Sequence, residues 1–191
     1  SGLLSAADQA RIAALPGVQR AEFQREDQIQ WRSGQPRVAL LARALDPAQP
    51  QKSLPFVEPP RPLRAAAPPP LWVSEAMVDV HGVAVGSEIE LPLAGRSHRF
   101  TVAGVWRDYS RPRGTVVIER SRYVALTGDS SATNGALWLA ADATPAAVRE
   151  RLVRELPGGE QLDIGTAGDI RRTSLRIFDR SFAVTYWLQA V

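Results

Sequence analysis

The stretch Phe100-Thr101-Val102-Ala103-Gly104-Val105-Trp106 gives the clearest indication of the fold. Its alternating side chains and its β-branched residues predict a β-strand. A similar segment at 88–91 lies on the other side of a turn at Gly95, so the two segments are expected to pair in antiparallel fashion. Apolar runs at 115–118 and 135–139 predict two further strands. We therefore expect a β-sheet built around residues 100–106.

Capping residues predict two helices that flank these strands. Ser74 is a favourable N-cap for 75–81, and Gly82 suits the left-handed position that follows a helix. Thr144 precedes 145–156, a segment that begins with proline and is followed by proline and glycine. Both segments are therefore predicted to be helical.

The second of these helices also has an amphipathic pattern. Val148, Leu152 and Leu156 are spaced so that they share one face of the helix. Glu150 and Arg154 are four residues apart and are expected to form an ion pair on the outer face. The apolar face is therefore expected to pack against the core.

The N-terminal residues predict a helix followed by a β-hairpin. Residues 5–15 are rich in helix formers and end at Pro16-Gly17, which stops a helix. Alternating apolar residues at 18–31 and the apolar segment 37–45 read as two strands around a turn at Ser33-Gly34. These elements would form one small unit.

Proline dominates residues 46–70 and divides the chain. Proline cannot donate ladder hydrogen bonds and favours extended polyproline conformations, so this part is expected to be a stiff connector rather than a strand. The predicted fold is α+β and two-lobed, with small mixed or antiparallel sheets, short helices and a long C-terminal helix. The expected regions are a first lobe at 1–54 with the helix and hairpin, a connector at 55–71, a second, β-rich lobe at 72–168 that contains helix 145–156 and a short strand at 162–164, and a C-terminal segment at 169–191.

Residues 169–191 predict a long helix that leads toward a membrane. A capping-box spacing at 166–169 precedes a stretch without proline or glycine. Its first half is amphipathic, and its second half, from 182, is mostly apolar but has only about half of the roughly 20 residues that span a bilayer. The membrane-proximal candidates are arginines and the aromatic residues that suit an interfacial belt. They are Arg171, Arg172, Arg176, Arg180, Phe182, Tyr186 and Trp187.

Composition argues against several classes of protein. The chain has 191 residues, with 23 basic and 20 acidic side chains and a net charge of +3. The arginines are scattered among the carboxylates, and Lys52 is the sole lysine, so the clustered footprint of a nucleic-acid-binding protein is missing. The absence of cysteine excludes disulfides and thiolate metal sites.

Few residues suggest catalysis or metal binding. His81 and His98 are the only histidines, and their spacing is not that of a zinc site, so both are expected at the surface or at an edge. Residues 129–135 superficially resemble a calcium loop, but Ala140 stands where the bidentate glutamate belongs, so a plain loop is expected. Residues 165–168 could bind an anion at a helix start, although a simple cap is the preferred interpretation.

A polar cluster follows the strand quoted at the start. It contains Asp108 and Tyr109 beside Arg107, Arg111 and Arg113. Such a cluster is expected to be a solvated turn or a contact surface. Arg107, Asp108 and Tyr109 are the candidates for contact with a partner.

Four segments carry a resemblance to a known family. Residues 170–186 resemble the segment that enters a transmembrane helix in large FtsX-like ABC transporter permeases. Residues 72–76, 85–89 and 100–109 resemble parts of the MacB-like periplasmic core domain of the same transporters. The resemblance covers 74–191 well and the first seventy residues only loosely.

The resemblance implies a non-catalytic extracytoplasmic domain of an inner-membrane permease. Such a domain couples ATPase-driven motion to substrate export or extraction, or to a periplasmic partner. It implies no cofactor for this chain, because a separate cytoplasmic ATPase subunit handles ATP. The implied partners are that ATPase subunit, a second permease copy or pseudo-dimer half, and a periplasmic or lipid-linked substrate. The alternatives are a free-standing periplasmic binding or adaptor module, and a hydrolase that uses His81 or His98.

Overall fold

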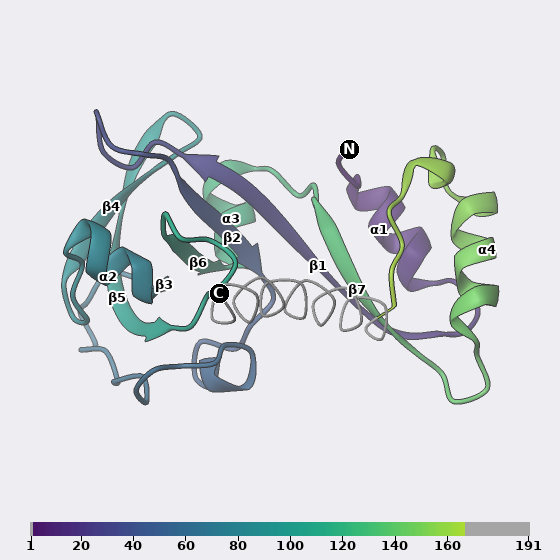
Figure 1. Ribbon diagram of the computed structural model, residues 1–191, viewed down its shortest axis with the longest axis horizontal. Coiled ribbons are helices and arrows are strands. Elements are labelled where there is room, and N and C mark those ends of the chain that lie inside the picture. Colours follow the sequence, from purple (N-terminus) through teal and green to yellow (C-terminus); the bar gives the residue numbers. More distant parts are fainter. Residues whose placement is uncertain (1, 167–191) are drawn as a thin grey trace, which may run out of the picture.

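A single seven-stranded sheet runs through residues 2–166, the part of the chain that the computed structural model describes (Figure 1). Its strand order is β4-β5-β3-β6-β2-β1-β7. The strands are β1 (Val18–Ile29), β2 (Val38–Arg43), β3 (Pro70–Ser74), β4 (Glu88–Leu93), β5 (Arg96–Trp106), β6 (Thr115–Glu119) and β7 (Asn134–Leu139). The helices are α1 (Ala6–Ala13), α2 (Glu75–His81), α3 (Arg120–Thr127) and α4 (Pro145–Glu155), with 3-10 turns η1 (Pro50–Lys52) and η2 (Gly159–Gln161). The long helix expected at 169–191 lies outside the described residues.

The sheet corrects the expectation of small separate sheets. Strand β6 lies between β2 and β3, parallel to β2 and antiparallel to β3. Val116 is paired with Leu40 on one side and with Val73 on the other, and all three side chains are buried. The α+β class is confirmed, but strands from both sides of the proline-rich region share one sheet because β6 joins them.

Strand β1 connects two parts of the molecule. Its second half, from Gln24 to Ile29, pairs with β2, and its first half, from Val18 to Gln24, pairs with β7 on the opposite edge. Both pairings are antiparallel, and the β1–β2 hairpin is the one that the sequence predicts. In Figure 1 the long ribbon of β1 runs diagonally from the central strands toward β7.

The two faces of the central strands are covered differently. On one face, alternate strand residues pack with Met77 of α2 and Tyr123 of α3. On the other face, Trp72 and Trp106 pack with Leu54 and Phe56 of residues 46–69, here called the proline-rich strap. The strap leaves β2 and returns to β3, so it covers a face of the sheet between two strands that are not neighbours.

Backbone contacts fix the strap against β5. The amide of Val57 donates to the carbonyl of Val105 at 3.0 Å, and the amide of Arg107 donates to the carbonyl of Pro55 at 2.9 Å. A Cβ atom at Gly104 would lie 2.8 Å from Cε1 of Phe56, so only glycine allows the aromatic ring to approach so closely.

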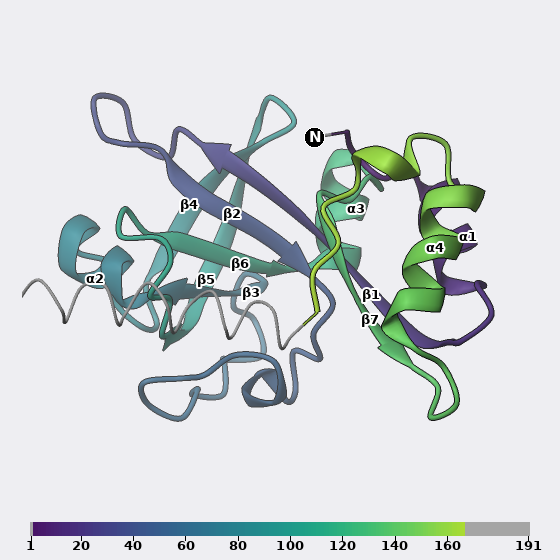
Figure 2. The same cartoon turned by 45° about the vertical axis from the view of Figure 1, so that its right-hand side comes forward.

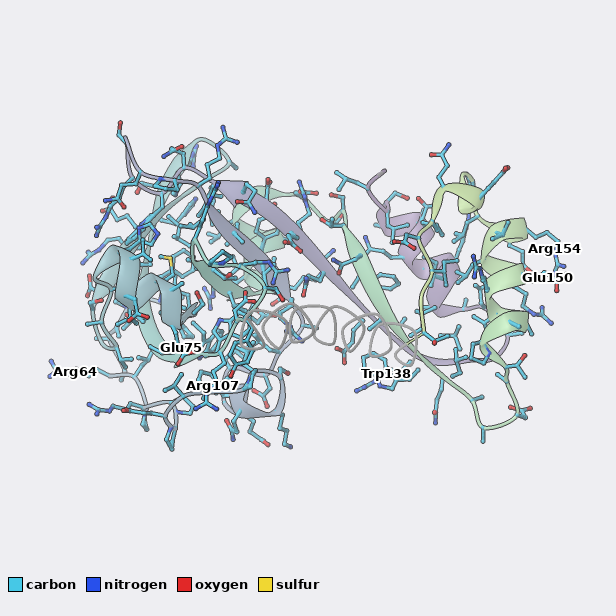
Figure 3. All side chains as sticks on the ribbon, viewed as in Figure 1. Arg64, Glu75, Arg107, Trp138, Glu150 and Arg154 are labelled. Atoms are coloured by element: carbon cyan, nitrogen blue, oxygen red, sulfur yellow. The ribbon has the colours of Figure 1, made fainter. Side chains whose placement is uncertain are left out.

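A third apolar cluster lies at the far end of the sheet. Helices α1 and α4 lie side by side there in both views (Figure 2). Val148, Leu152 and Leu156 are buried against Ile12 and Leu15, which confirms the predicted apolar face of the second helix. The predicted ion pair between Glu150 and Arg154 is also present, with 3.5 Å between Arg154 Nη1 and Glu150 Oε1 (Figure 3).

The capping residues place the helix ends well, with one difference. Gly82 takes the left-handed conformation at the end of α2, and Thr144 Oγ1 accepts a hydrogen bond from the amide of Ala147 at 3.3 Å. Ser74 occupies the N-cap position of α2, but its side chain does not cap the helix. Its Oγ accepts instead from the amide of Thr115 at 2.9 Å, so it ties β3 to β6.

One helix was not predicted from the sequence, and one predicted strand is wrong. Helix α3 was not expected, because its sequence has little amphipathic pattern; Glu119 caps it by accepting from the amides of Ser121 and Arg122. The strand expected at 162–164 is absent, since these residues have no strand conformation and follow the turn η2. Leu162 and Ile164 pack with the third cluster through their side chains alone.

Within residues 2–166, none of the helices has the length and apolar character needed to cross a membrane.

The glycine at the start of β6 provides a test of the packing around α2. Gly114 has φ +107°, and a Cβ there would lie 2.5 Å from Sδ of Met77, which is fully buried. Gly86 has φ +86° with nothing within 4 Å of the same position, so it is a matched control. Gly86→Ala is expected to lower the free energy of unfolding by about 1 kcal/mol through its backbone alone. Gly114→Ala is expected to lower it by about 2 kcal/mol more, because the added methyl overpacks the core.

Urea unfolding of the two variants followed by circular dichroism measures this difference. Equal losses in the two variants would contradict the close packing of Gly114 on Met77.

Candidate interaction surface

The loop between β5 and β6, residues 107–114, carries the candidate contact residues. The side chain of Tyr109 is 88% exposed, and Arg107 is exposed as well. Figure 3 shows Arg107 near the proline-rich strap, and its backbone amide donates a hydrogen bond to the carbonyl of Pro55 in that strap. An aromatic and a guanidinium side chain in neighbouring positions are residue types that protein interfaces favour.

Asp108 points inward between these two exposed residues. Its side chain is only 3% exposed. Oδ2 accepts from Thr115 Oγ1 at 2.7 Å, and Oδ1 accepts from the amide of Ser110 at 3.0 Å. Arg111 Nη1 donates to Oδ2 at 3.2 Å. Asp108 therefore anchors the loop to the start of β6, and Arg107 and Tyr109 are the exposed members of the predicted contact surface.

Arg111 connects the loop to β1. Its Nε and Nη2 donate to the two carboxylate oxygens of Glu26, each at 3.0 Å. These hydrogen bonds raise the pKa of Arg111 above its ordinary value, with a smaller contribution from Asp108. A bidentate pair of this kind fixes orientation as well as position. The loop is thus held at both ends, by β1 and by β6.

His81 is buried, whereas the sequence predicts a histidine at the surface or at an edge. It is 6% exposed, and Trp31 lies edge-on to its ring, with 5.6 Å between the ring centroids. Nδ1 lies 2.8 Å from Oε1 of Gln35, and Nε2 lies 2.9 Å from the carbonyl oxygen of Arg113. Both ring nitrogens are engaged by the protein, so the side chain links loops and has no free nitrogen to act as a base. His98 is half-buried on β5.

Residues 129–133 form the expected loop, whereas residues 134 and 135 already belong to β7. Oδ1 of Asp129 accepts from the amide and hydroxyl of Ser131 at 2.9 and 2.6 Å. Oδ2 accepts from Arg25 Nε at 3.0 Å and from the Tyr123 hydroxyl at 3.2 Å. Protein donors thus occupy both oxygens. The part of the chain that is described, 2–166, has no group of three or more metal-ligating side chains that could hold an ion.

The membrane-proximal candidates lie outside the described residues. They are Arg171, Arg172, Arg176, Arg180, Phe182, Tyr186 and Trp187. The anion-binding possibility at 165–168 extends past the described part of the chain in the same way.

The fold of the chain is that of a known class of transporter domain. The extracellular domain of the noncanonic ABC-type transporter YknZ from Gram-positive bacteria aligns with 84% of this chain and 86% of its own, with a TM-score of 0.57 at 10% identity. The periplasmic region of MacB from Actinobacillus actinomycetemcomitans aligns with 80% of this chain and 72% of its own, with a TM-score of 0.53 at 12% identity. The resemblance to the extracytoplasmic domain of MacB-like permeases is therefore confirmed at the level of the fold.

A sequence relative belongs to the same class of transporter. The chain is similar to the uncharacterized ABC transporter permease protein Rv0987 of Mycobacterium tuberculosis, with 35% identity over 92 residues. The match covers 48% of this chain and 11% of that permease, so the chain spans only a small part of the length of its relative. No protein-family model matches the chain.

Asp129 makes stability depend on acid pH. Burial alone would raise the pKa of this carboxyl, but the hydrogen bonds from Ser131, Arg25 and Tyr123 outweigh it and hold the pKa at about 2. The ordinary value is 3.8. A lowered pKa in the folded state gives a stabilisation that is fully present above the unfolded value and is lost as the pH falls from about 4 to about 2.

Asp129→Asn is expected to lower the free energy of unfolding at pH 7 by about 1 kcal/mol, the scale for partly exposed charged hydrogen bonds. The difference from the wild type should shrink as the pH falls toward 2. Denaturant unfolding at pH 7, 4 and 2.5 measures it, with the exposed Asp142→Asn as the control. A difference that stays constant across this range would rule out the lowered pKa.

Proposed function

We propose that this chain is the non-catalytic extracytoplasmic domain of an ABC transporter permease. In this role it transmits ATPase-driven motion to substrate export or extraction, or to a partner outside the membrane. The observation that supports the proposal most directly is the fold, which aligns with the extracellular domain of YknZ over 84% of the chain. The permease relative from Mycobacterium tuberculosis supports the same class from sequence.

The way β1 is paired suits the transmission of motion. One continuous strand takes part in the central sheet through β2 and in the α1–α4 end through β7. A displacement applied at one end is carried by backbone hydrogen bonds to the other, because the strand cannot shift in register without breaking both pairings. The domain is thus suited to move as one body.

Partners follow from this role. A separate cytoplasmic ATPase subunit would act through the membrane part of the permease, and a second permease copy or pseudo-dimer half would complete the transporter. The segment 169–191 would lead into the membrane, with its four arginines and its aromatic residues at the interface. Arg107 and Tyr109 would contact the partner or substrate, since they are exposed on a loop that Asp108 and Arg111 hold in place.

A non-catalytic role agrees with the chemistry of the described residues. Both nitrogens of His81 are bound within the protein, and both oxygens of Asp129 accept from protein donors. The most polar clusters therefore serve to connect elements of the fold.

Cysteine labelling tests the location of the domain. The chain has no cysteine, so a single Tyr109→Cys substitution in a cysteine-free form of the whole permease gives one reactive position. A membrane-impermeant maleimide is expected to label it in intact spheroplasts. Val117→Cys, which is fully buried, is the matched control and should react only after denaturation. Labelling of Tyr109→Cys only after lysis would contradict an extracytoplasmic location.

The double variant Arg107→Ala/Tyr109→Ala tests the contact surface. Arginine and tyrosine at an interface centre commonly contribute more than about 1 kcal/mol each. We expect the variant permease to reach the membrane at the wild-type level but to complement a permease-deletion strain at least about fivefold less well, the factor that a loss of only about 1 kcal/mol produces. Val80→Ala, an exposed apolar residue on α2, is the control. Full complementation by the double variant would remove this loop from the proposed contact surface.

A further inference from the structure

An open groove with three arginines lies where two loops meet at one end of the sheet. Its volume is about 490 Å³, and its lining includes Arg37, Arg111 and Arg113. Arg37 immediately precedes β2, and the other two arginines belong to the loop that precedes β6. Because β2 and β6 are parallel neighbours, the residues before their first positions lie at the same end of the sheet. The fold thus brings Arg37 to the same groove as two arginines more than seventy residues away in sequence.

The charges in the groove are unevenly compensated. Arg111 is bound by the carboxylates of Glu26 and Asp108. Arg37 and Arg113 are exposed, and neither forms an ion pair with any residue in the range 2–166. Two of the arginines that line the groove therefore have no carboxylate partner in the described chain.

The groove is held in shape by buried contacts. His81 lies between the two loops, with Nδ1 2.8 Å from Gln35 Oε1 and Nε2 2.9 Å from the Arg113 carbonyl oxygen. The amide of Ala39 donates to the carbonyl of Gly114 at 3.0 Å, which joins the two strand starts directly. These hydrogen bonds fix the backbone of the loop before β2 and of the loop before β6. The arginines that line the groove therefore belong to loops that are already ordered.

We propose that this groove binds a phosphate group. Guanidinium groups donate paired hydrogen bonds that match the oxygens of phosphate. A phosphate group carries about −1.5 to −2 charges at neutral pH, which balances the two uncompensated arginines better than a single carboxylate would. Gln28 also lines the groove and supplies a further amide donor. His81 is a positioning residue here, since it acts through the loops and does not reach the ligand.

The phosphate group could belong to free phosphate or to a lipid headgroup, and the inference does not rest on the proposed transport function. The 191-residue chain is first titrated with sodium phosphate at constant ionic strength, and amide shifts are recorded by 1H–15N NMR. The amides of Arg113 and Gly114 are expected to shift in a saturable manner. The variant Arg37→Gln/Arg113→Gln is expected to weaken binding by about tenfold or more, because it removes both uncompensated charges.

A matched control separates a specific site from bulk charge. Arg61→Gln/Arg64→Gln removes the same charge from exposed arginines of the proline-rich strap and should bind phosphate as the wild type does. All four substituted residues are exposed, and thermal unfolding checks that each variant is folded. Absence of a saturable shift, or equal weakening in the two double variants, would overturn the proposal.

A second arm identifies the source of the phosphate group. Co-sedimentation is measured with phosphatidylcholine vesicles that contain phosphatidic acid, whose headgroup is a phosphate monoester, and with phosphatidylcholine vesicles alone. Binding to the anionic vesicles that Arg37→Gln/Arg113→Gln loses and Arg61→Gln/Arg64→Gln keeps would support a lipid headgroup. Saturable NMR shifts without such vesicle binding would support free phosphate or a soluble phosphate ester.

Discussion

The divided pairing of β1 is the constraint on which the rest of the structure depends. Gln24 lies at the point where the pairing with β2 and the pairing with β7 meet. Each half of the strand contributes to a different apolar cluster, because Phe23 packs with α1 and α4 while Ile29 packs with the central strands. Each cluster combines residues from several segments of the chain. A register shift in β1 would move its side chains to the opposite face in both clusters at once.

Local sequence signals predicted most helices and strands, whereas the order of the strands in the sheet could not be predicted from them. The ends of α2 and α4 follow from Gly82 and Thr144, since capping depends on residues within one turn. The insertion of β6 between β2 and β3 depends on contacts between segments far apart in sequence, and no short pattern encodes it. The proline-rich strap was therefore expected to separate two lobes, although it crosses one face of a continuous sheet. Helix α3 was missed because its cap is a glutamate and its faces differ little in polarity.

The candidate surface was predicted only in part, because some of its contacts join segments that are far apart in sequence. Arg107 and Tyr109 were identified as neighbours in a polar turn, and their exposure follows from the loop. The inward position of Asp108 depends on Thr115 and on Arg111, whose partner Glu26 is 85 residues away in sequence. Two of the hydrogen bonds to Asp108 are local, those from the amide of Ser110 and from Arg111, and the one from Ser110 was the available signal that the backbone holds this carboxylate. His81 was misplaced because its partners, too, come from distant loops.

The third apolar cluster has a consequence for the order of folding. It combines α1 with α4, and Gln9 of α1 is hydrogen-bonded to Ser130, 121 residues away. The central strands β2 to β6 can pair while α1 and the first half of β1 still lack β7 and α4. Contacts of such long range are slow to form, because the entropy of closing the loop is lost before the contacts are gained. We therefore expect the docking of β7 and α4 on the edge of β1 to be a late step of folding, and until it occurs one apolar side of the nascent domain is open to other chains.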